Sequence, residues 1–334
     1  MICGAARQAR WFSEEPRFAY PHVLLERIAR LAFPNSSVVE VTPLREGLRN
    51  ANFRIKLNCV PDSIVIRVYQ HDFSLCKKEI DVMRLIGSSV PVPELIHAEP
   101  NGWDNLPPFA LFRHIEGISF RELKRAGDAS AVAQAAHSVG ETVAAIGRVT
   151  FRKSGWLAAG LSVVDPHFET ANQLASFIDD CLESPSFRER VPLAVRKGIS
   201  AFAWSLSPRL AELGPQTHLV HGDFGKRNIM VRRTEGCWKV AAILDWEFAL
   251  SGTPLVDLGH FLRYERTSHS AAEAQFSAGY LESGGKLPLD WRQLARLIDL
   301  TALSESLTHD ELPDGVVAEL LELVRGTVEN PDLS

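Results

Sequence analysis

Apolar and polar residues alternate along several short stretches in the first third of the chain. The stretches "SVVEVTPL", "ANFRIKL" and "SIVIRVY" are rich in β-branched residues and are separated by short turn segments, which predicts three strands. A fourth strand is predicted in "FALFRHIEG", ending at Gly117. The stretch "VPVPELIHAE" is expected to be extended, because Pro91 and Pro93 disfavour a helix.

Apolar residues at helical spacing dominate the rest of the chain. Two helices are predicted in the strand-rich part, over residues 22–33 and from Ser74 to Gly87. Beyond Gly117, helical runs are predicted at 127–149, 172–182, 193–213, 257–264, 291–307 and 315–328. This order predicts a bilobal α+β protein, with a small antiparallel-sheet lobe over 1–115 and a larger, mostly helical lobe over 116–334. The cleft between the lobes is the expected ligand site.

The composition fits a globular chain. Of the 334 residues, 46% are apolar, and the net charge is −5, whereas a nucleic-acid binder would usually carry a basic stripe. No segment approaches the ~18 uninterrupted apolar residues that span a bilayer, and the start, "MICGAARQARWFSEEP", lacks the apolar core of a secretory signal. The five scattered cysteines fit reduced thiols. We therefore expect a cytoplasmic protein without a membrane or nucleic-acid partner, and the sequence leaves its oligomeric state open.

A dense polar run interrupts the apolar pattern in "HLVHGDFGKRN", which begins at His218. It contains Asp223 and, five residues later, Asn228. An Asp/Asn-rich turn with capping roles is the structural interpretation of such a run. A turn alone, however, would need Gly and Asn but not this number of polar side chains.

A hairpin is predicted directly after this run. The β-favouring stretches "IMVRR" and "WKVAAIL" flank "TEG", which is a hairpin signal centred near the glycine. Paired positions in an antiparallel hairpin have a constant sum, so Asn228 should lie opposite about residue 244, next to Asp245. A carboxylate and an amide oxygen that meet beside phosphate groups suit Mg²⁺, and Asp223 is left to accept a proton from a hydroxyl. A hydrolase with two metal ions is another use of these residues together with Glu247.

Arg67 and Glu79 are predicted to form a second pair. Alternation in "SIVIRVY" puts Arg67 on the opposite face from Ile64, Ile66 and Val68. On the helix from Ser74, Glu79 falls in the middle of the apolar arc, where a carboxylate is costly unless it is paired. Arg67 is the nearest candidate cation in sequence for this pairing, and such a pair could orient the guanidinium onto phosphate oxygens. The alternatives are a structural salt bridge, or a glutamate that reaches solvent.

These motifs together resemble a known family. "HGDFGKRN" followed by "ILDWE" is similar to the catalytic loop and metal-binding segment of aminoglycoside phosphotransferases and of their relatives among the choline, homoserine and macrolide kinases. "REGLRNANFRI", "IVIRV", "VPVPELI" and "GTPLVDLGHF" follow the order of that family, and the resemblance covers roughly residues 38–264. It implies a protein-kinase-like fold.

The resemblance also implies the role of each residue. Asp223 would be the catalytic base, and Asn228 and Asp245 would hold Mg²⁺. Arg67, with Glu79, would steady the phosphates of ATP.

Further positions follow from the same resemblance. The Arg113 carbonyl and the Ile115 amide would read the adenine edge, and Asp257 would be structural, as an N-cap or a loop anchor. The chain departs from the pattern in two respects: Arg67 stands where protein kinases have Lys, and the glycine-rich loop is reduced to Gly47.

Three features argue against a protein substrate. Lys226 stands three residues after the expected base, whereas a protein-kinase loop places its lysine two after it. The D-F-G segment is replaced by "DWE", and there is no A-P-E motif. The 12 positions from Asp245 to Asp257 are too few for an activation segment. A nucleotide-binding relative without activity would be expected to have lost Asp223, Asn228 or Asp245, and all three are present.

The function implied is an ATP-dependent O-phosphotransferase acting on a hydroxyl of a small molecule. The first expectation for this acceptor is an aminoglycoside-type antibiotic. Aminoglycosides are polycations, and their enzymes line the helical lobe with carboxylates. The candidates here are Glu282, Asp310, Glu311, Asp314 and Glu319. The alternative is a metabolite kinase of choline, homoserine, sugar or macrolide type. Trp246 is expected to pack beneath the metal-binding segment, with sugar stacking as the alternative.

Overall fold

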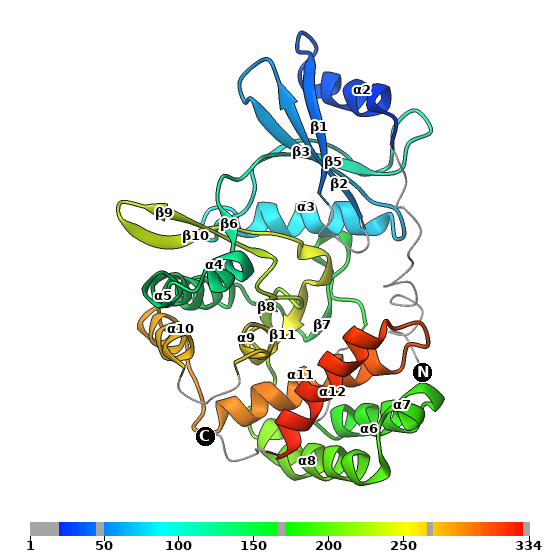
Figure 1. Cartoon of the computed structure of the whole chain (residues 1–334), viewed down its shortest axis with the longest axis vertical. Helices are drawn as coiled ribbons and strands as arrows, with labels where there is room; N and C mark the ends of the chain where they lie inside the picture. The colour runs from blue at the N-terminus through cyan, green and yellow to red at the C-terminus, as the bar shows by residue number, and fades with distance from the viewer. Residues whose placement is uncertain (1–19, 45–49, 166–170, 266–269, 330–334) are drawn as a thin grey trace.

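The computed structural model describes residues 20–44, 50–165, 171–265 and 270–329. Two lobes are stacked along the long axis of the molecule (Figure 1). The upper lobe is a five-stranded sheet in the order β1-β2-β3-β5-β4, in which all neighbours are antiparallel. Its strands are β1 (Val38–Leu44), β2 (Ala51–Leu57), β3 (Ser63–Val68), β4 (Leu95–Glu99) and β5 (Phe109–Arg113). The predicted strands are therefore confirmed.

The two faces of β3 have different partners. Ile64, Ile66 and Val68 lie in a core cluster with residues of α2 (His22–Ala32). Tyr69, which continues the opposite face, donates its hydroxyl hydrogen to Glu79 of α3 (Ser74–Ile86). The alternation predicted from the sequence thus separates an apolar face from a polar face that points at α3.

The connection between the lobes follows β5. This strand ends at Arg113, whereas the sequence predicted a strand as far as Gly117. The neighbouring strand β3 begins at Ser63, whose carbonyl accepts the last pairing hydrogen bond, from the His114 N–H. Beyond His114 no partner residue remains on β3. The proposed boundary between the two lobes, at residues 115 and 116, falls within this connection.

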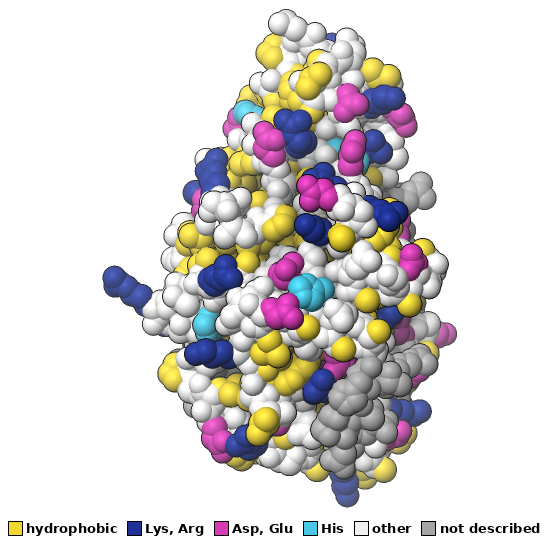
Figure 2. Space-filling model, turned by 90° about the vertical axis from the view of Figure 1, so that its left-hand side faces the viewer, with side chains coloured by type: hydrophobic (Ala, Val, Ile, Leu, Met, Phe, Trp, Pro, Cys, Tyr) yellow, Lys and Arg dark blue, Asp and Glu magenta, His cyan; other side chains and the backbone are white. Residues whose placement is uncertain are grey.

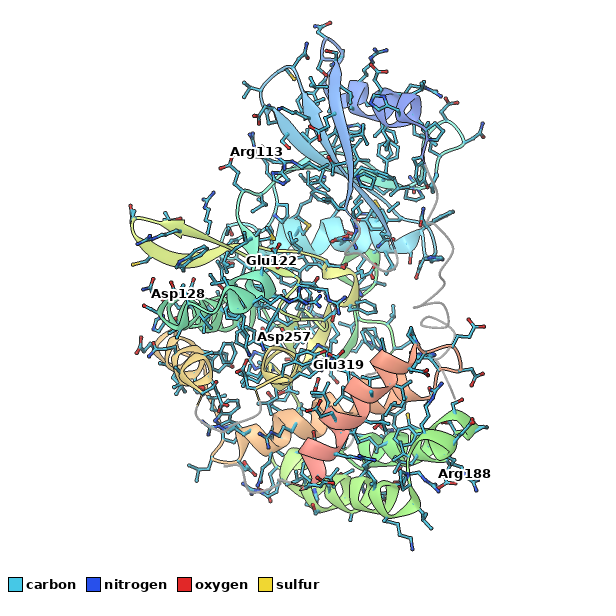
Figure 3. The ribbon with its side chains drawn as sticks, in the orientation of Figure 1. Arg113, Glu122, Asp128, Arg188, Asp257 and Glu319 are labelled. Atoms are coloured by element: carbon cyan, nitrogen blue, oxygen red, sulfur yellow. The ribbon has the colours of Figure 1, made fainter. Side chains whose placement is uncertain are left out.

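The lower lobe is mostly helical, and the predicted helical runs are confirmed. Its helices are α4 (Phe120–Ala126), α5 (Ala129–Ile146), α6 (Ala171–Leu182), α7 (Pro185–Arg190), α8 (Leu193–Ala211), α9 (Leu255–Leu262), α10 (Ala271–Glu282), α11 (Trp291–Leu307) and α12 (Asp314–Glu329), with the short 3₁₀ turns η1 (Ala159–Leu161) and η2 (Trp246–Phe248). Helices α4, α7 and α10 were not predicted. The start of α4 carries a capping box, in which Ser119 and Glu122 bond to each other's backbone N–H groups, and Glu122 lies at this start in Figure 3.

Two small sheets complete the lower lobe. One contains β6 (Ile118–Ser119) and the predicted hairpin, β9 (Ile229–Thr234) and β10 (Cys237–Ile243). The other contains β7 (Gly155–Trp156), β11 (Leu250–Gly252) and β8 (His218–Val220). On the side with α5, α10 and the hairpin, basic and acidic side chains are interspersed (Figure 2), so this face carries no continuous basic stripe. Within the described residues, no helix is both long and apolar enough to cross a bilayer.

Helices α5 and α10 pack with their backbones almost in contact. A Cβ atom added at Gly140 would lie 2.0 Å from the Phe276 carbonyl oxygen, and one added at Gly279 would lie 2.1 Å from the His137 carbonyl oxygen. Contact this close is possible only where both helices have glycine.

Gly140→Ala is therefore expected to force the two helices apart and to lower the free energy of unfolding by about 1–3 kcal/mol. Thermal or denaturant unfolding measures this loss. The matched control is Gly326→Ala on α12, where an added Cβ meets nothing within 4 Å. There the better helix propensity of alanine should leave stability unchanged or raise it. Equal stability of the two variants would contradict the close packing.

Candidate active site

The hairpin sets the position of the predicted metal ligands. Glu235 (φ 53°) and Gly236 (φ 84°) form a two-residue turn with both φ values positive, as in a type I′ hairpin. The register is Val231 opposite Val240, but Met230 opposite Ala242, because a bulge intervenes. Residue 244 therefore pairs with Asn228, and its N–H donates to the Asn228 carbonyl at 2.8 Å. The predicted pairing is confirmed, and it places Asp245 one residue from the partner of Asn228.

Asp223 and Asn228 are in direct contact. The Asn228 side-chain amide donates to a carboxylate oxygen of Asp223 at 3.0 Å and to the Asp223 carbonyl at 2.9 Å. These bonds use the Nδ2 atom of Asn228, so its Oδ1 atom is the one that could act as a ligand. Burial, followed by the carboxylate of Asp245, raises the pKa of Asp223 to about 6. A buried carboxylate whose pKa is raised by a second carboxylate marks a suitable place for a cation.

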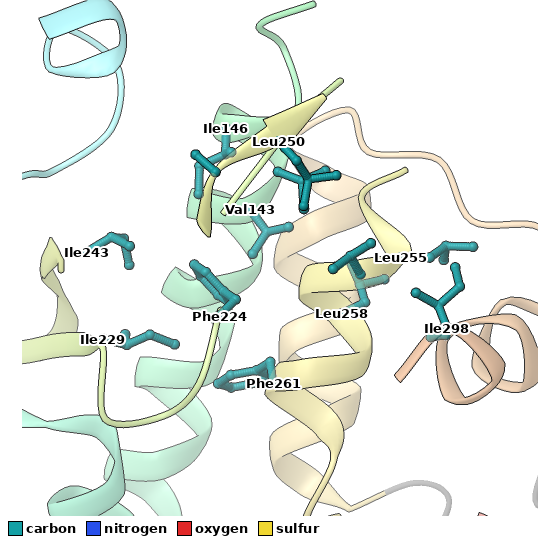
Figure 4. Packing of buried hydrophobic residues seen from close by; sticks show 14 of the residues in the cluster. Val143, Ile146, Phe224, Ile229, Ile243, Leu250, Leu255, Leu258, Phe261 and Ile298 are labelled. Atoms are coloured by element: carbon teal, nitrogen blue, oxygen red, sulfur yellow. The ribbon is translucent and has the colours of Figure 1, made fainter. Parts of the chain in front are cut away.

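The loop that carries Asp223 is fixed from below. Phe224 is fully buried and packs among Val143, Ile229 and Phe261 of the main core (Figure 4). Asp257 accepts the His221 N–H at 2.9 Å and the Gly222 N–H at 3.0 Å. It lies inside the first turn of α9, after the N-cap Pro254, at the centre of the lower lobe in Figure 3. Of the two structural roles predicted for Asp257, the structure shows the loop anchor.

Gly222 and His221 shape this loop. Gly222 has φ +81°, and an added Cβ would lie 2.3 Å from the Phe248 carbonyl oxygen. The Nε2 atom of His221 is 2.8 Å from the Leu244 carbonyl, while its Nδ1 accepts the Asp223 N–H at 3.2 Å. Burial lowers the pKa of His221 to about 4. A neutral ring with its proton on Nε2 satisfies both contacts, so His221 ties the loop to the hairpin end and is not a proton carrier.

The predicted pair of Arg67 and Glu79 is present. The Nε atom of Arg67 is 3.2 Å from Glu79, and both side chains are buried. The Trp246 N–H also donates to Glu79, at 3.2 Å. On its other side, Nη2 of Arg67 donates to Asp245 at 2.5 Å. Arg67 therefore joins the upper lobe to the segment that carries the expected metal ligand.

Asp245 itself has an unusual backbone. Its φ is 68°, in the left-handed region that few residues other than glycine adopt. Strain of this kind persists where the surroundings fix it, often at functional sites. Trp246, the next residue, is fully buried, and its indole N–H donates to the Ile243 carbonyl at 3.1 Å. It packs beneath the segment and is inaccessible for sugar stacking.

The donor set fits a single hard cation. The side-chain oxygens of Asn228 and Asp245 are the ligand types that Mg²⁺ prefers, with water and substrate phosphate completing its shell. The described residues contain no group of three or more His, Cys, Asp or Glu side chains arranged to hold a metal ion without other ligands. This observation does not favour a hydrolase with two protein-held metal ions.

The predicted adenine-reading residues lie at the connection between the lobes. Arg113 ends β5, its N–H donates to the Glu94 carbonyl at 2.9 Å, and its side chain pairs with the Glu94 carboxylate at 2.6 Å. Figure 3 labels Arg113 on the left-hand side of the upper lobe. Ile115 is half-buried in the segment that follows. Their contacts with a nucleotide stay a prediction, and Gly47 lies outside the described residues.

Two lysines beside the site are buried. Lys78 lies outside the apolar arc of its helix, but it is buried all the same, and its ammonium donates to the Glu247 carbonyl at 2.7 Å. The reason is that the lower lobe covers this side of α3. Lys226 is also buried, and its ammonium lies 2.8 Å from Glu265. Burial lowers the pKa of Lys226 to about 8.

The roles of Asn50 and Glu247 in this site do not follow from the sequence pattern. The Asn50 side chain donates to Glu247 at 2.8 Å in a buried contact between residues 197 positions apart. Glu247 is visible in "DWE", but no local pattern marks Asn50. Only the docking of the two lobes brings this pair together.

The surroundings of Asp223 on the lower lobe are cationic. Arg227 and Arg263 act on the Asp223 carboxylate and oppose the rise in its pKa. Arg263 is held by Asp299 through two of its nitrogens, at 2.6 and 3.0 Å. The carboxylates predicted for an acidic pocket have other neighbours: Glu282 pairs with His137, Asp310 with Ser186 and Glu319 with Tyr264, while Glu311 and Asp314 are exposed.

Comparison with known proteins agrees with this geometry. A model of the phosphotransferase enzyme family matches residues 40–297. Acyl-CoA dehydrogenase family member 11 of Rattus norvegicus is 26% identical over 239 residues. That match covers 67% of this chain and 28% of the rat protein, so the chain spans less than a third of this relative.

Solved structures show the fold. One is aminoglycoside phosphotransferase APH(4)-Ia with AMP-PNP and hygromycin B, with a TM-score of 0.64 and 18% identity over 92% of this chain and 98% of that one. The GDP complex of aminoglycoside 2′-phosphotransferase-IIIa has a TM-score of 0.69 and 17% identity, with coverage of 93% and 99%. A GDP and kanamycin complex has a TM-score of 0.68 and 18% identity, with coverage of 91% and 98%. The predicted protein-kinase-like fold is confirmed.

Proposed function

The chain belongs to the phosphotransferase enzyme family, and from this premise we propose that it transfers the γ-phosphoryl group of ATP to a hydroxyl of a small molecule. The observation that carries the proposal is the contact of the Asn228 amide with the Asp223 carboxylate, at 3.0 Å, beside the hairpin end that presents Asp245. A proton acceptor and two oxygen ligands are thereby joined in one structural unit.

Each side chain has a distinct part in the proposed reaction. Asp223 accepts the proton of the acceptor hydroxyl, while Asn228 fixes the orientation of its carboxylate. Asn228 and Asp245 would hold Mg²⁺, which when bound neutralises charge on the phosphate oxygens. Arg67, oriented by Glu79, binds phosphate oxygens of the nucleotide. Phosphoryl transfer has a loose transition state, so positioning and charge neutralisation supply most of the rate enhancement.

The acceptor is proposed in two forms. An aminoglycoside is the first, and its support is the fold shared with enzymes solved with hygromycin B and kanamycin. A hydroxylated metabolite is the alternative, and one feature of the site favours it. Arg227 and Arg263 lie on the lower-lobe side of Asp223, where they would repel the ammonium groups of a polycation.

Release of ADP from ATP and Mg²⁺ tests the proposal with a panel of acceptors. The panel contains aminoglycosides, macrolides, choline, homoserine and sugars. Stimulated ADP release with one class identifies the acceptor. Absence of Mg²⁺-dependent nucleotide binding in calorimetry would contradict the whole proposal.

The rate should depend on the ionisation of Asp223. Because its pKa is raised to about 6, the carboxylate required as base is lost as the pH falls through that value. We expect kcat/KM for the acceptor to decline about tenfold per pH unit below pH 6, and to level off about one pH unit above it. A pH–rate profile measures this, and a profile without an acid limb down to pH 5 would contradict the role.

A further inference from the structure

Glu247 is a buried carboxylate to which several parts of the upper lobe are attached. Its side chain is 2% exposed, and it lies in η2, two residues after Asp245. Its Oε2 atom accepts the amide hydrogen of Asn50 at 2.8 Å, immediately before β2. Its backbone carbonyl accepts the ammonium of Lys78 from α3 at 2.7 Å. The metal-binding segment is therefore held to both β2 and α3 through this residue.

The same carboxylate approaches Arg67. The Nη2 atom of Arg67 lies 2.5 Å from Asp245 Oδ1 and 3.5 Å from Glu247 Oε2. Glu79 approaches the other end of the guanidinium, at Nε. Two carboxylates thus compete for one nitrogen, and Asp245 holds it in this structure. Glu247 is the farther of the two and is kept directed at Nη2 by the bond from Asn50.

We propose that Glu247 is a positioning residue that takes over Nη2 of Arg67 when Asp245 turns to a bound metal ion. The inference rests on the metal role of Asp245 proposed above. When the carboxylate of Asp245 is shared with a cation, its attraction for the guanidinium weakens. A buried cation that loses a partner is costly unless another carboxylate is within reach. The Oε2 atom of Glu247 already lies 3.5 Å from Nη2 of Arg67, so only a small movement brings the two atoms to an ordinary ion-pair distance.

Glu247→Gln tests the exchange, because glutamine keeps the shape and an acceptor for Asn50 but has no charge. Calorimetry measures binding of AMP-PNP with and without Mg²⁺. We expect the Kd with Mg²⁺ to rise about tenfold, the scale of one charge-assisted hydrogen bond. Without Mg²⁺, Asp245 still holds Arg67, so the Kd should change by less than about twofold. Equal weakening under both conditions, or none, would overturn the proposal.

Asn50→Ala provides the second test, since Asn50 acts on the same oxygen. Its loss should weaken Mg²⁺-dependent binding by a few-fold, and the double variant should bind no more weakly than Glu247→Gln alone. If Glu247 instead held the metal directly, Asn50→Ala would leave binding unchanged. The matched control is Glu189→Gln, an exposed position on α7, which should behave as the wild type.

The proposed function and the role of Glu247 can be contradicted separately. Wild-type protein that does not bind AMP-PNP with Mg²⁺ would remove the proposed function itself. Wild-type binding that Glu247→Gln leaves intact would remove only the role of Glu247. Melting temperatures of all variants show whether a loss of binding comes from loss of the fold.

Discussion

Asp223→Asn is expected to lower kcat by about 10²–10⁴-fold, the usual contribution of a positioned general base. Asparagine has the same shape and can still accept the bond from Asn228, but it cannot take up the proton of an acceptor hydroxyl. Arg67 and Asp245 do not contact Asp223 through any hydrogen bond that the described residues show, so nucleotide binding should stay nearly normal. Steady-state ADP release and calorimetry with AMP-PNP measure the two effects.

The stability of this variant is an independent control. The pKa of Asp223 is raised by burial to about 6, so the folded state prefers the protonated form. For such a group, stability is greatest below its unfolded pKa of about 3.9 and is lost as the pH rises through the folded value. Asparagine imitates the protonated form, so the melting temperature at pH 7 should be unchanged or higher. Near-normal turnover of a stable Asp223→Asn protein would exclude this residue as the base.

Asp245→Ala should remove the dependence of nucleotide binding on magnesium. This carboxylate is the only acidic side chain among the two proposed metal ligands, and its loss leaves only the amide oxygen of Asn228. We expect AMP-PNP with Mg²⁺ to bind at least about tenfold more weakly, with little further difference between metal-containing and metal-free buffer. Calorimetric titration in the two buffers measures this directly.

The contacts of Arg67 indicate that Asp245→Ala should affect the metal site and not the position of the guanidinium. In the absence of Asp245, Arg67 still has Glu79 at 3.2 Å and Glu247 at 3.5 Å, so the cation site should survive. The control is Asp180→Ala, an exposed carboxylate on α6. A magnesium effect on binding that persists in Asp245→Ala would assign the metal to other residues.

Local patterns predicted the elements that carry the site. The hairpin follows from β-favouring stretches around a glycine turn, and the partner of Glu79 follows from the cost of a carboxylate on an apolar helix face. Both depend on interactions within a few residues or between sequential elements. The same reasoning placed Asn228 opposite residue 244. The turn and the bulge each displace the register by a residue from the simplest hairpin, but in opposite directions, so the predicted pairing is kept.

Contacts between distant elements could not be predicted from the sequence. Lys78 lies on the charged side of its helix in the sequence, and nothing local shows that η2 covers that side. The pairing of Asn50 with Glu247 joins residues from the two lobes. Helix α10 packs through Gly279 against α5, and a glycine in a short apolar run does not by itself indicate a helix. These features arise from docking, which a local pattern does not encode.

The hairpin imposes a parity rule on changes in its length. Side chains along a strand alternate between the two faces with a period of two. The single bulge between Val240 and Ala242 therefore determines on which face of the hairpin Asp245 lies relative to Asn228. Adding or deleting one residue on each strand near the turn would leave this relative orientation intact, so longer or shorter hairpins are compatible with the same chemistry. An odd insertion within one arm would instead rotate Asp245 to the wrong side, unless a second bulge absorbed it.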